Sequence, residues 1–138
     1  MKDPLSLLPG YALRRASVTM MGALSDALQA LDLRFTESTV LILIGANPGI
    51  RQRDLVGLLD IKRANMTPLI ARLEAQGWVA RTAMDGRSWG LSLTPAGMDL
   101  HDRVWSVVQN LETRMLSHVP DDLVPAFQNT LVAIWRQW

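Results

Sequence analysis

The chain of 138 residues contains no cysteine. This absence excludes a disulfide framework, a thiol redox switch and every zinc site built on cysteine ligands. Histidine is almost as scarce, since His101 and His118 are the only two and their spacing matches no compact zinc motif. The sequence therefore predicts neither a metal nor another cofactor.

Long apolar runs are missing as well. No stretch approaches the roughly 20 apolar residues that a membrane-spanning helix needs, and the N-terminus has no basic segment followed by an apolar one. We therefore expect a soluble cytoplasmic protein with no membrane partner. Its composition, 49% hydrophobic and 20% charged, is typical of a globular chain and predicts one domain over residues 1–138.

The arrangements that support catalysis are also absent from the sequence. We find no Ser/His/Asp arrangement and no glycine-rich loop that would hold a phosphate. His101 lies near Asp99 and Asp102, but a solvated helix face explains this group better than a site. We therefore predict that the protein is not an enzyme.

The distribution of charge is more informative than its total of +1. The segment from Arg51 to Arg87 contains seven basic and four acidic residues, a net charge of +3. The rest of the chain, with seven basic and nine acidic residues, has a net charge of −2. A basic middle between acidic ends favours contact with a polyanion, although a solvated charged face would give the same pattern.

Apolar residues recur at helical spacing in four segments of the first half of the chain. We expect helices at residues 9–31, 36–46, 52–59 and 63–76. Thr36 is the predicted N-cap of the second helix, and Gly77 is expected to end the fourth. In the short third helix, we expect the core-facing residues to be Leu55, Leu58 and Leu59.

The next segment reads as a β-hairpin. Residues 78–83 are extended in character, Asp85-Gly86 is a turn signal, and residues 87–93 form the return strand. In that strand Trp89, Leu91 and Leu93 alternate with small residues, which predicts one buried face. Thr94-Pro95 then predicts the start of a long helix, and a last helix is expected after Pro120.

This order gives a mainly α fold with a helix-turn-helix followed by a two-stranded wing. The long outer helices come from the two ends of the chain, and we expect them to pack together. They are too apolar for a lone small domain, so the excess apolar surface predicts a dimer interface.

Three blocks in the middle of the chain carry a family resemblance. They are Leu73-Glu74-Ala75-Gln76-Gly77-Trp78-Val79-Ala80-Arg81, Asp85-Gly86-Arg87, and Leu91-Ser92-Leu93-Thr94-Pro95-Ala96-Gly97. With these blocks, residues 34–100 resemble the MarR family of transcriptional regulators. Three features depart from the family pattern: Gly86 replaces an arginine that is frequent in the wing, Pro68 lies inside the fourth helix, which it should bend, and Trp89 is a large residue for the second wing strand.

The resemblance implies a winged helix-turn-helix lobe at residues 34–94, between dimerisation helices at residues 5–31 and 95–138. It also implies a homodimer that binds double-stranded DNA at a pseudo-palindromic operator. Such a protein usually represses transcription and is released by a small effector, in several members an aromatic or phenolic one.

In this family the fourth helix would enter the major groove with its N-terminal residues. The candidates for base contact are Lys62, Arg63, Asn65, Thr67 and Pro68. Arginine pairs well with guanine and asparagine with adenine, whereas threonine or proline can contact a thymine methyl group. The alternative is that these residues simply form a solvated helix start.

The wing and the flanking arginines complete the expected DNA surface. Arg87 would enter the minor groove, oriented by Asp85, unless Asp85-Gly86 serves the turn alone. Candidates for phosphate contact are Arg51, Arg53, Arg72 and Arg81. For Arg72 and Arg81 the alternative is an ion pair within the protein, with Glu74 or Asp85.

The tryptophans of the outer helices predict core or dimer packing first. The alternative is the aromatic wall of an effector pocket. The candidates for such a pocket are Tyr11, Arg14, Arg15 and Trp105, in which arginine would hold a carboxylate and the rings would stack. Two rival functions stay open: a winged-helix module that binds a protein, and a DNA-binding regulator with no effector.

Overall fold

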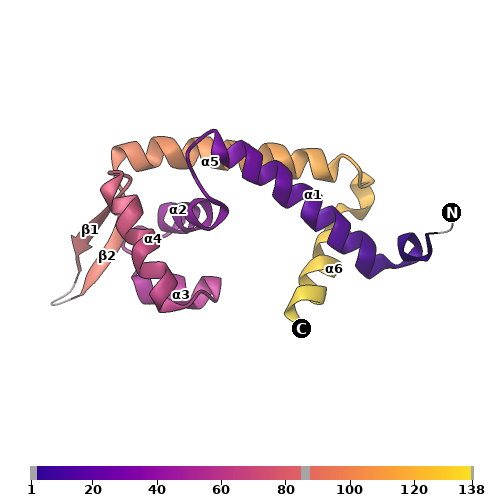
Figure 1. The fold of residues 1–138 in the computed structure, drawn as a ribbon, viewed down its shortest axis with the longest axis horizontal. Coiled ribbons are helices and arrows are strands. Elements are labelled where there is room, and N and C mark those ends of the chain that lie inside the picture. The colour runs from indigo at the N-terminus through magenta and orange to yellow at the C-terminus, as the bar shows by residue number, and fades with distance from the viewer. Residues whose placement is uncertain (1–2, 85–87, 138) are drawn as a thin grey trace.

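The computed structural model describes residues 3–84 and 88–137 (Figure 1). The order of its elements confirms the predicted arrangement of helices around one hairpin. The elements are η1 (Pro4–Leu7), α1 (Pro9–Gln29), α2 (Phe35–Ala46), α3 (Gln52–Leu59), α4 (Arg63–Ala75), β1 (Val79–Ala83), β2 (Trp89–Leu93), α5 (Pro95–Leu116), η2 (Asp121–Leu123) and α6 (Val124–Arg136).

The long helix α5 forms one side of the molecule, and α1 runs beside it (Figure 1). Helices α2, α3 and α4 and the hairpin gather under the N-terminal half of α5, whereas α6 lies near its other end. The expectation that the outer helices pack together is met by α1 and α5. Helix α6, in contrast, buries none of its described residues.

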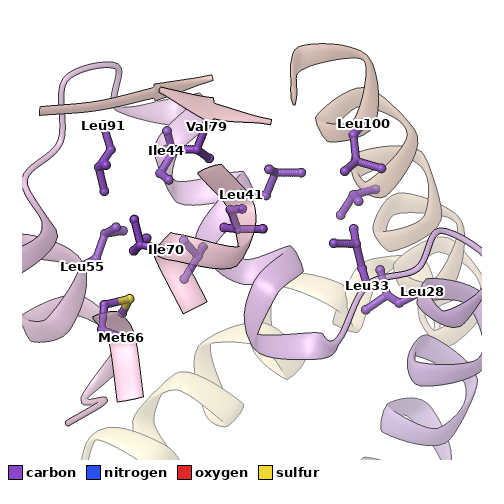
Figure 2. Packing of buried hydrophobic residues seen from close by; sticks show 13 residues of the cluster. Leu28, Leu33, Leu41, Ile44, Leu55, Met66, Ile70, Val79, Leu91 and Leu100 are labelled. Atoms are coloured by element: carbon purple, nitrogen blue, oxygen red, sulfur yellow. The ribbon is translucent and has the colours of Figure 1, made fainter. Parts of the chain in front are cut away.

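The main core lies where α2, α3, α4 and the hairpin meet (Figure 2). Helix α2 passes through its middle, and Leu41 and Ile44 are fully buried there. Leu55 of α3, Ile70 of α4 and Leu91 of β2 close the core from the other sides. This central position explains why α2 carries a nearly continuous apolar run from residue 40 to residue 44.

The N-cap of α2 was predicted wrongly, because it is Arg34 and not Thr36. The backbone N–H of Arg34 donates a 2.8 Å hydrogen bond to the Glu37 carboxylate. A carboxylate at the third helical position satisfies a free N–H and interacts favourably with the helix dipole. Because Glu37 accepts the Arg34 N–H, the helix begins one residue before Thr36.

Two residues predicted to face the core are exposed. Leu58 lies on the outside of α3, because this two-turn helix turns Leu55, and not Leu58, into the core. Trp89 is 58% exposed, whereas Leu91 on the same strand face is 2% exposed. The strand extends beyond the core that supports it, and Trp89 stands past that edge.

An isolated β-bridge joins the hairpin to the segment just before α3. Ile50 bridges Leu91 in an antiparallel pair, with 2.8 Å hydrogen bonds from the Gly49 N–H to the Leu91 carbonyl and from the Leu91 N–H to the Ile50 carbonyl. A Cβ atom at Gly90 would lie 2.5 Å from the Gly49 carbonyl oxygen. Only glycine therefore fits at Gly90 without moving the backbone.

The predicted start of α5 is confirmed. Thr94 is its N-cap, and the Thr94 hydroxyl accepts a 3.0 Å hydrogen bond from the Gly97 N–H and donates one of 2.5 Å to the Gly77 carbonyl. Gly77, with φ of +73°, follows α4 as expected. No helix among the described residues is long and apolar enough to cross a membrane.

Gly97 provides a test of this corner of the fold. A Cβ atom there would collide with the Trp78 carbonyl oxygen, so we expect Gly97→Ala to lower the free energy of unfolding by about 2 kcal/mol. The matched control is Gly57→Ala in α3, which meets no atom within 4 Å and should stabilise by up to about 1 kcal/mol. Urea unfolding measures both, and equal stabilities of the two variants would contradict the packing described.

Candidate nucleic-acid interface

The first two turns of α4 present a polar surface. Lys62 is the N-cap, Arg63 is the first helical residue, and both are exposed, as are Asn65, Thr67 and Pro68. The opposite face of the helix supplies three buried residues to the core: Met66, Ile70 and Leu73. Burial of one face therefore fixes α4 with the five predicted base-contact residues turned outward.

A hydrogen bond joins this surface to α3. The Gln52 side-chain amide donates to the Thr67 hydroxyl at 2.9 Å, and this hydroxyl donates to the Arg63 carbonyl at 3.2 Å. Pro68 follows at once, inside the helix as predicted, and it has no N–H to donate to the preceding turn. The Thr67 hydroxyl is thus engaged within the protein, which leaves its methyl group for an outside partner.

Two of the predicted phosphate-contact residues lie at the start of α3. Arg51 is the N-cap of this helix, and Arg53 lies in its first turn with an exposed side chain. The only ion-pair partner within 4 Å of Arg53 among the described residues is its neighbour Asp54, at 3.6 Å. Such a contact between exposed side chains is weak, so Arg53 is free to meet an anion.

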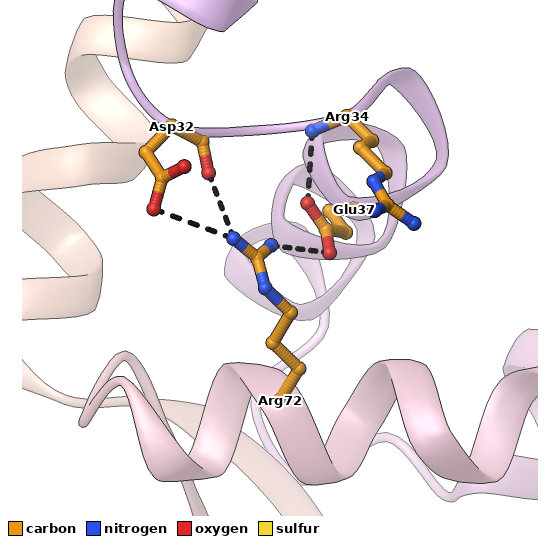
Figure 3. Close-up of polar contacts among 4 residues, drawn as sticks. All are labelled: Asp32, Arg34, Glu37 and Arg72. Carbon is orange, nitrogen blue, oxygen red and sulfur yellow. Dashed lines mark hydrogen bonds and ion pairs between the residues drawn. The ribbon is translucent and has the colours of Figure 1, made fainter.

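Arg72 is bound within the protein, to acidic groups other than the two that the sequence suggested (Figure 3). Its guanidinium pairs with Glu37, and its Nη2 donates to the Asp32 carbonyl at 3.2 Å and to the Asp32 carboxylate at 3.3 Å. The hydrogen bond to Glu37 raises the pKa of Arg72, although burial opposes this shift. These contacts tie α4 to the corner between α1 and α2.

Arg81 forms an ion pair within the protein, which was the alternative to phosphate contact. Its Nε and Nη2 donate to the two carboxylate oxygens of Glu74 at 2.8 and 3.2 Å. This bidentate bond raises the pKa of Arg81. Arg72 and Arg81 therefore act first as links within the protein, and phosphate contact by either stays a prediction. Asp85 and Arg87 lie outside the described residues, so their contact with the minor groove also stays a prediction.

The predicted effector residues occupy two separate helices. Tyr11, Arg14 and Arg15 lie in the first two turns of α1, where Arg15 donates to the Tyr11 hydroxyl at 3.4 Å and covers its ring at 5.9 Å. Trp105 lies on α5 with its side chain partly exposed. None of these four residues lines the two surface hollows described next.

Both hollows lie beside the helix-turn-helix. One, of about 740 Å³, lies between the α2–α3 loop and α3. The other, of about 540 Å³, lies between the start of α2 and α4, where Arg34, Asn65 and Arg72 are among its lining residues. Neither hollow was expected from the sequence, and neither were the contacts of Glu37 and Asp32 with Arg72. One signal was available, since Glu37 is the only acidic residue between positions 33 and 53.

Comparison with known proteins identifies this arrangement. A sequence model of the MarR family matches residues 31–88. The HTH-type transcriptional repressor Rv2887 of Mycobacterium tuberculosis is 30% identical over 112 residues, which cover 80% of this chain and 81% of that repressor. The chain belongs to the MarR family. Its α3, α4 and hairpin are thus the helix-turn-helix and wing of a winged-helix regulator.

Solved structures agree over nearly the whole chain. The transcriptional repressor CouR bound to a 23-mer DNA duplex is 31% identical to this chain. The two structures align over 97% of each chain with a TM-score of 0.83. CouR from Rhodococcus jostii RHA1 bound to p-coumaroyl-CoA is 28% identical, covers 96% of this chain and 95% of that one, and has a TM-score of 0.79. A structure of Rv2887 with salicylic acid is 28% identical, covers 92% and 96%, and has a TM-score of 0.71.

The contacts of Arg72 give a test of how α4 is held. We expect Arg72→Met to lower the melting temperature clearly, because it leaves the Glu37 carboxylate, 5% exposed, without its cationic partner. Arg81→Met, the matched control, removes a more exposed pair and should change the melting temperature little. Glu37→Gln combined with Arg72→Met should recover much of the loss, because it removes the buried charge and keeps an oxygen that accepts the Arg34 N–H. A melting temperature equally low in both single variants would contradict the distinction.

Proposed function

We propose that the protein is a dimeric, sequence-specific DNA-binding repressor of transcription, acting in the cytoplasm and not as an enzyme. The observation that carries this proposal is the exposed face of α4 from Lys62 to Pro68, next to the basic start of α3. The similarity to CouR bound to a DNA duplex supports it. In this arrangement α4 enters the major groove, and the wing reaches the adjacent minor groove.

The candidate side chains take three roles. Arg63 and Asn65 read bases, since their side chains can form paired hydrogen bonds with guanine and adenine, and the Thr67 methyl group faces a thymine. Arg51 and Arg53 contact phosphates, which fix the position of α4 on the duplex without reading sequence, whereas Lys62 and Pro68 stay candidates for base contact. Arg87 contacts the minor groove from the wing, with Asp85 orienting it.

The dimer is proposed to form through residues 5–31 and 95–138, outside the DNA-binding lobe at residues 34–94. In the lone chain these segments expose large apolar side chains that a monomer would leave in water. They include Leu7, Leu8, Val18, Ile134 and Trp135, of which Trp135 is 67% exposed. A two-fold dimer places two α4 helices on the half-sites of a pseudo-palindromic operator.

A small aromatic effector is proposed to release the DNA. Rv2887 has been solved with salicylic acid and CouR with p-coumaroyl-CoA, and both compounds carry an aromatic ring. An effector that binds one dimer shape better than another lowers DNA affinity when the favoured shape misplaces the two α4 helices. Tyr11, Arg14, Arg15 and Trp105 stay the candidate residues for such a site.

Binding to DNA from immediately upstream of the protein's own gene tests base reading. We expect Arg63→Ala to weaken this binding about tenfold and to change binding to scrambled DNA little. Arg53→Ala should weaken both alike and reduce the slope of log K against log salt by about 1. The control is Arg103→Ala on α5, which should match wild type. Fluorescence anisotropy across a salt series measures all four proteins.

The same titration separates the rival functions. Equal, weak binding of the wild type to both DNAs would mean either a distant operator or the protein-interaction module, and a pull-down that captures a protein partner would favour the module. Addition of salicylate or p-coumaroyl-CoA to the specific complex is expected to release the DNA. Binding that no aromatic compound weakens would favour a regulator without an effector.

The oligomeric state provides an independent test. We expect wild type to be a dimer by light scattering and Trp135→Glu to be monomeric at micromolar concentration, because the substitution places a charge in the apolar interface. Gln128→Glu, on the same helix and also exposed, is the control and should stay dimeric. A wild-type monomer at working concentration would contradict the two-fold arrangement.

A further inference from the structure

Trp89 is a large apolar side chain with no place in the core. It opens β2 and pairs across the hairpin with Ala83, a residue too small to cover an indole. Leu91, two residues further on the same face, is buried against the core near Leu55 (Figure 2). At Trp89 this support has ended, and 58% of the residue is exposed. The indole is therefore largely open to solvent and available to a partner.

The strand contacts place Trp89 on the side where α3 begins. The bridge between Ile50 and Leu91 is antiparallel, so the chain that follows Ile50 runs alongside the part of β2 that precedes Leu91. The residues after Ile50 are Arg51, the N-cap of α3, and Gln52, its first residue. The start of α3 and Trp89 therefore lie at the same end of the lobe.

This end is continuous with the proposed DNA surface. The Gln52 side chain is hydrogen-bonded to the Thr67 hydroxyl on α4, so α3 connects the wing strand to the helix proposed to read bases. Arg51 and Arg53 make the intervening surface basic, which fits the charge of a phosphate backbone. Trp89 thus lies on the wing strand, at the end of the lobe where α3 begins, and α3 is bonded to the helix proposed for the major groove.

From this placement we propose that Trp89 packs its indole ring against deoxyribose of the DNA strand that separates the two grooves. This inference rests on the proposed function and adds an apolar contact to it. The C–H faces of the sugars are the apolar part of the backbone, and a rigid aromatic ring covers them at low entropic cost. The contact releases no counterions, so its contribution does not depend on salt.

The salt series distinguishes this contact from an ionic one. Trp89→Ala is expected to weaken operator binding about tenfold at every salt concentration, with the slope of log K against log salt unchanged. Trp89→Phe, which retains an aromatic ring, should lose about threefold or less. Leu58→Ala, at an exposed apolar residue near the end of α3, is the matched control and should bind as wild type does. Circular dichroism and melting temperature check that each variant is folded.

Hydroxyl-radical footprinting reports directly on the sugars. Wild type should protect deoxyriboses between the two grooves. Trp89→Ala should lose that protection, whereas Trp89→Phe should lose only a small part of it. If wild type binds the operator specifically and Trp89→Ala has the same affinity and footprint, this inference is overturned and the proposed function stands. A changed salt slope in Trp89→Ala would overturn it too. No preference of wild type for the operator would overturn the proposed function itself.

Discussion

A single buried carboxylate, that of Glu37, connects the parts of this molecule. It accepts the backbone N–H of Arg34 and so starts α2, and it holds the guanidinium of Arg72 on α4. Through Arg72, the Asp32 corner that ends α1 joins the same cluster. A carboxylate removed from water must be paired, and Glu37 is paired on both sides. The corner between α1 and α2 and the last turn of α4, which are 35 to 40 residues apart, are therefore held at one point by directional bonds.

This cluster gives α4 a fixed relation to the helices outside the lobe. Apolar packing of Ile70 and Leu73 tolerates small rotations, whereas the Arg72 guanidinium loses bonds if α4 turns. Helix α1 leads directly into the corner that Arg72 holds, and α1 belongs to the proposed dimer interface. The bonds of Arg72 to Asp32 and Glu37 thus connect the end of α1 directly to α4.

The parts of the fold that the sequence predicted correctly depend on local rules. Thr94-Pro95 starts a helix, Gly77 ends one and period-two alternation marks β2, because each pattern acts within a few residues. The error at Trp89 depends on tertiary structure, because the core ends beneath Leu91. The error at the N-cap of α2 is local, because Glu37, three residues after Arg34, accepts the Arg34 N–H.

The candidate site follows the same division. The outward direction of Lys62, Arg63 and Asn65 followed from the apolar spacing of α4, which sequence shows. The partners of Arg72 did not, because Asp32 and Glu37 lie 40 and 35 residues away and meet it only in the folded chain. Charge alone cannot tell an arginine that binds phosphate from one that binds a carboxylate of its own protein.

The reach of a single α4 makes the proposed dimer a requirement of function. Two exposed turns of a recognition helix contact roughly three or four base pairs, and such a short sequence recurs throughout a genome. Specificity then depends on a second α4 at a fixed distance, since the free energies of the two half-sites add. The apolar faces of α1 and α6, which the lone chain leaves uncovered, would set that distance. By this argument the surfaces furthest from the DNA contribute to sequence recognition as much as the residues that touch the bases.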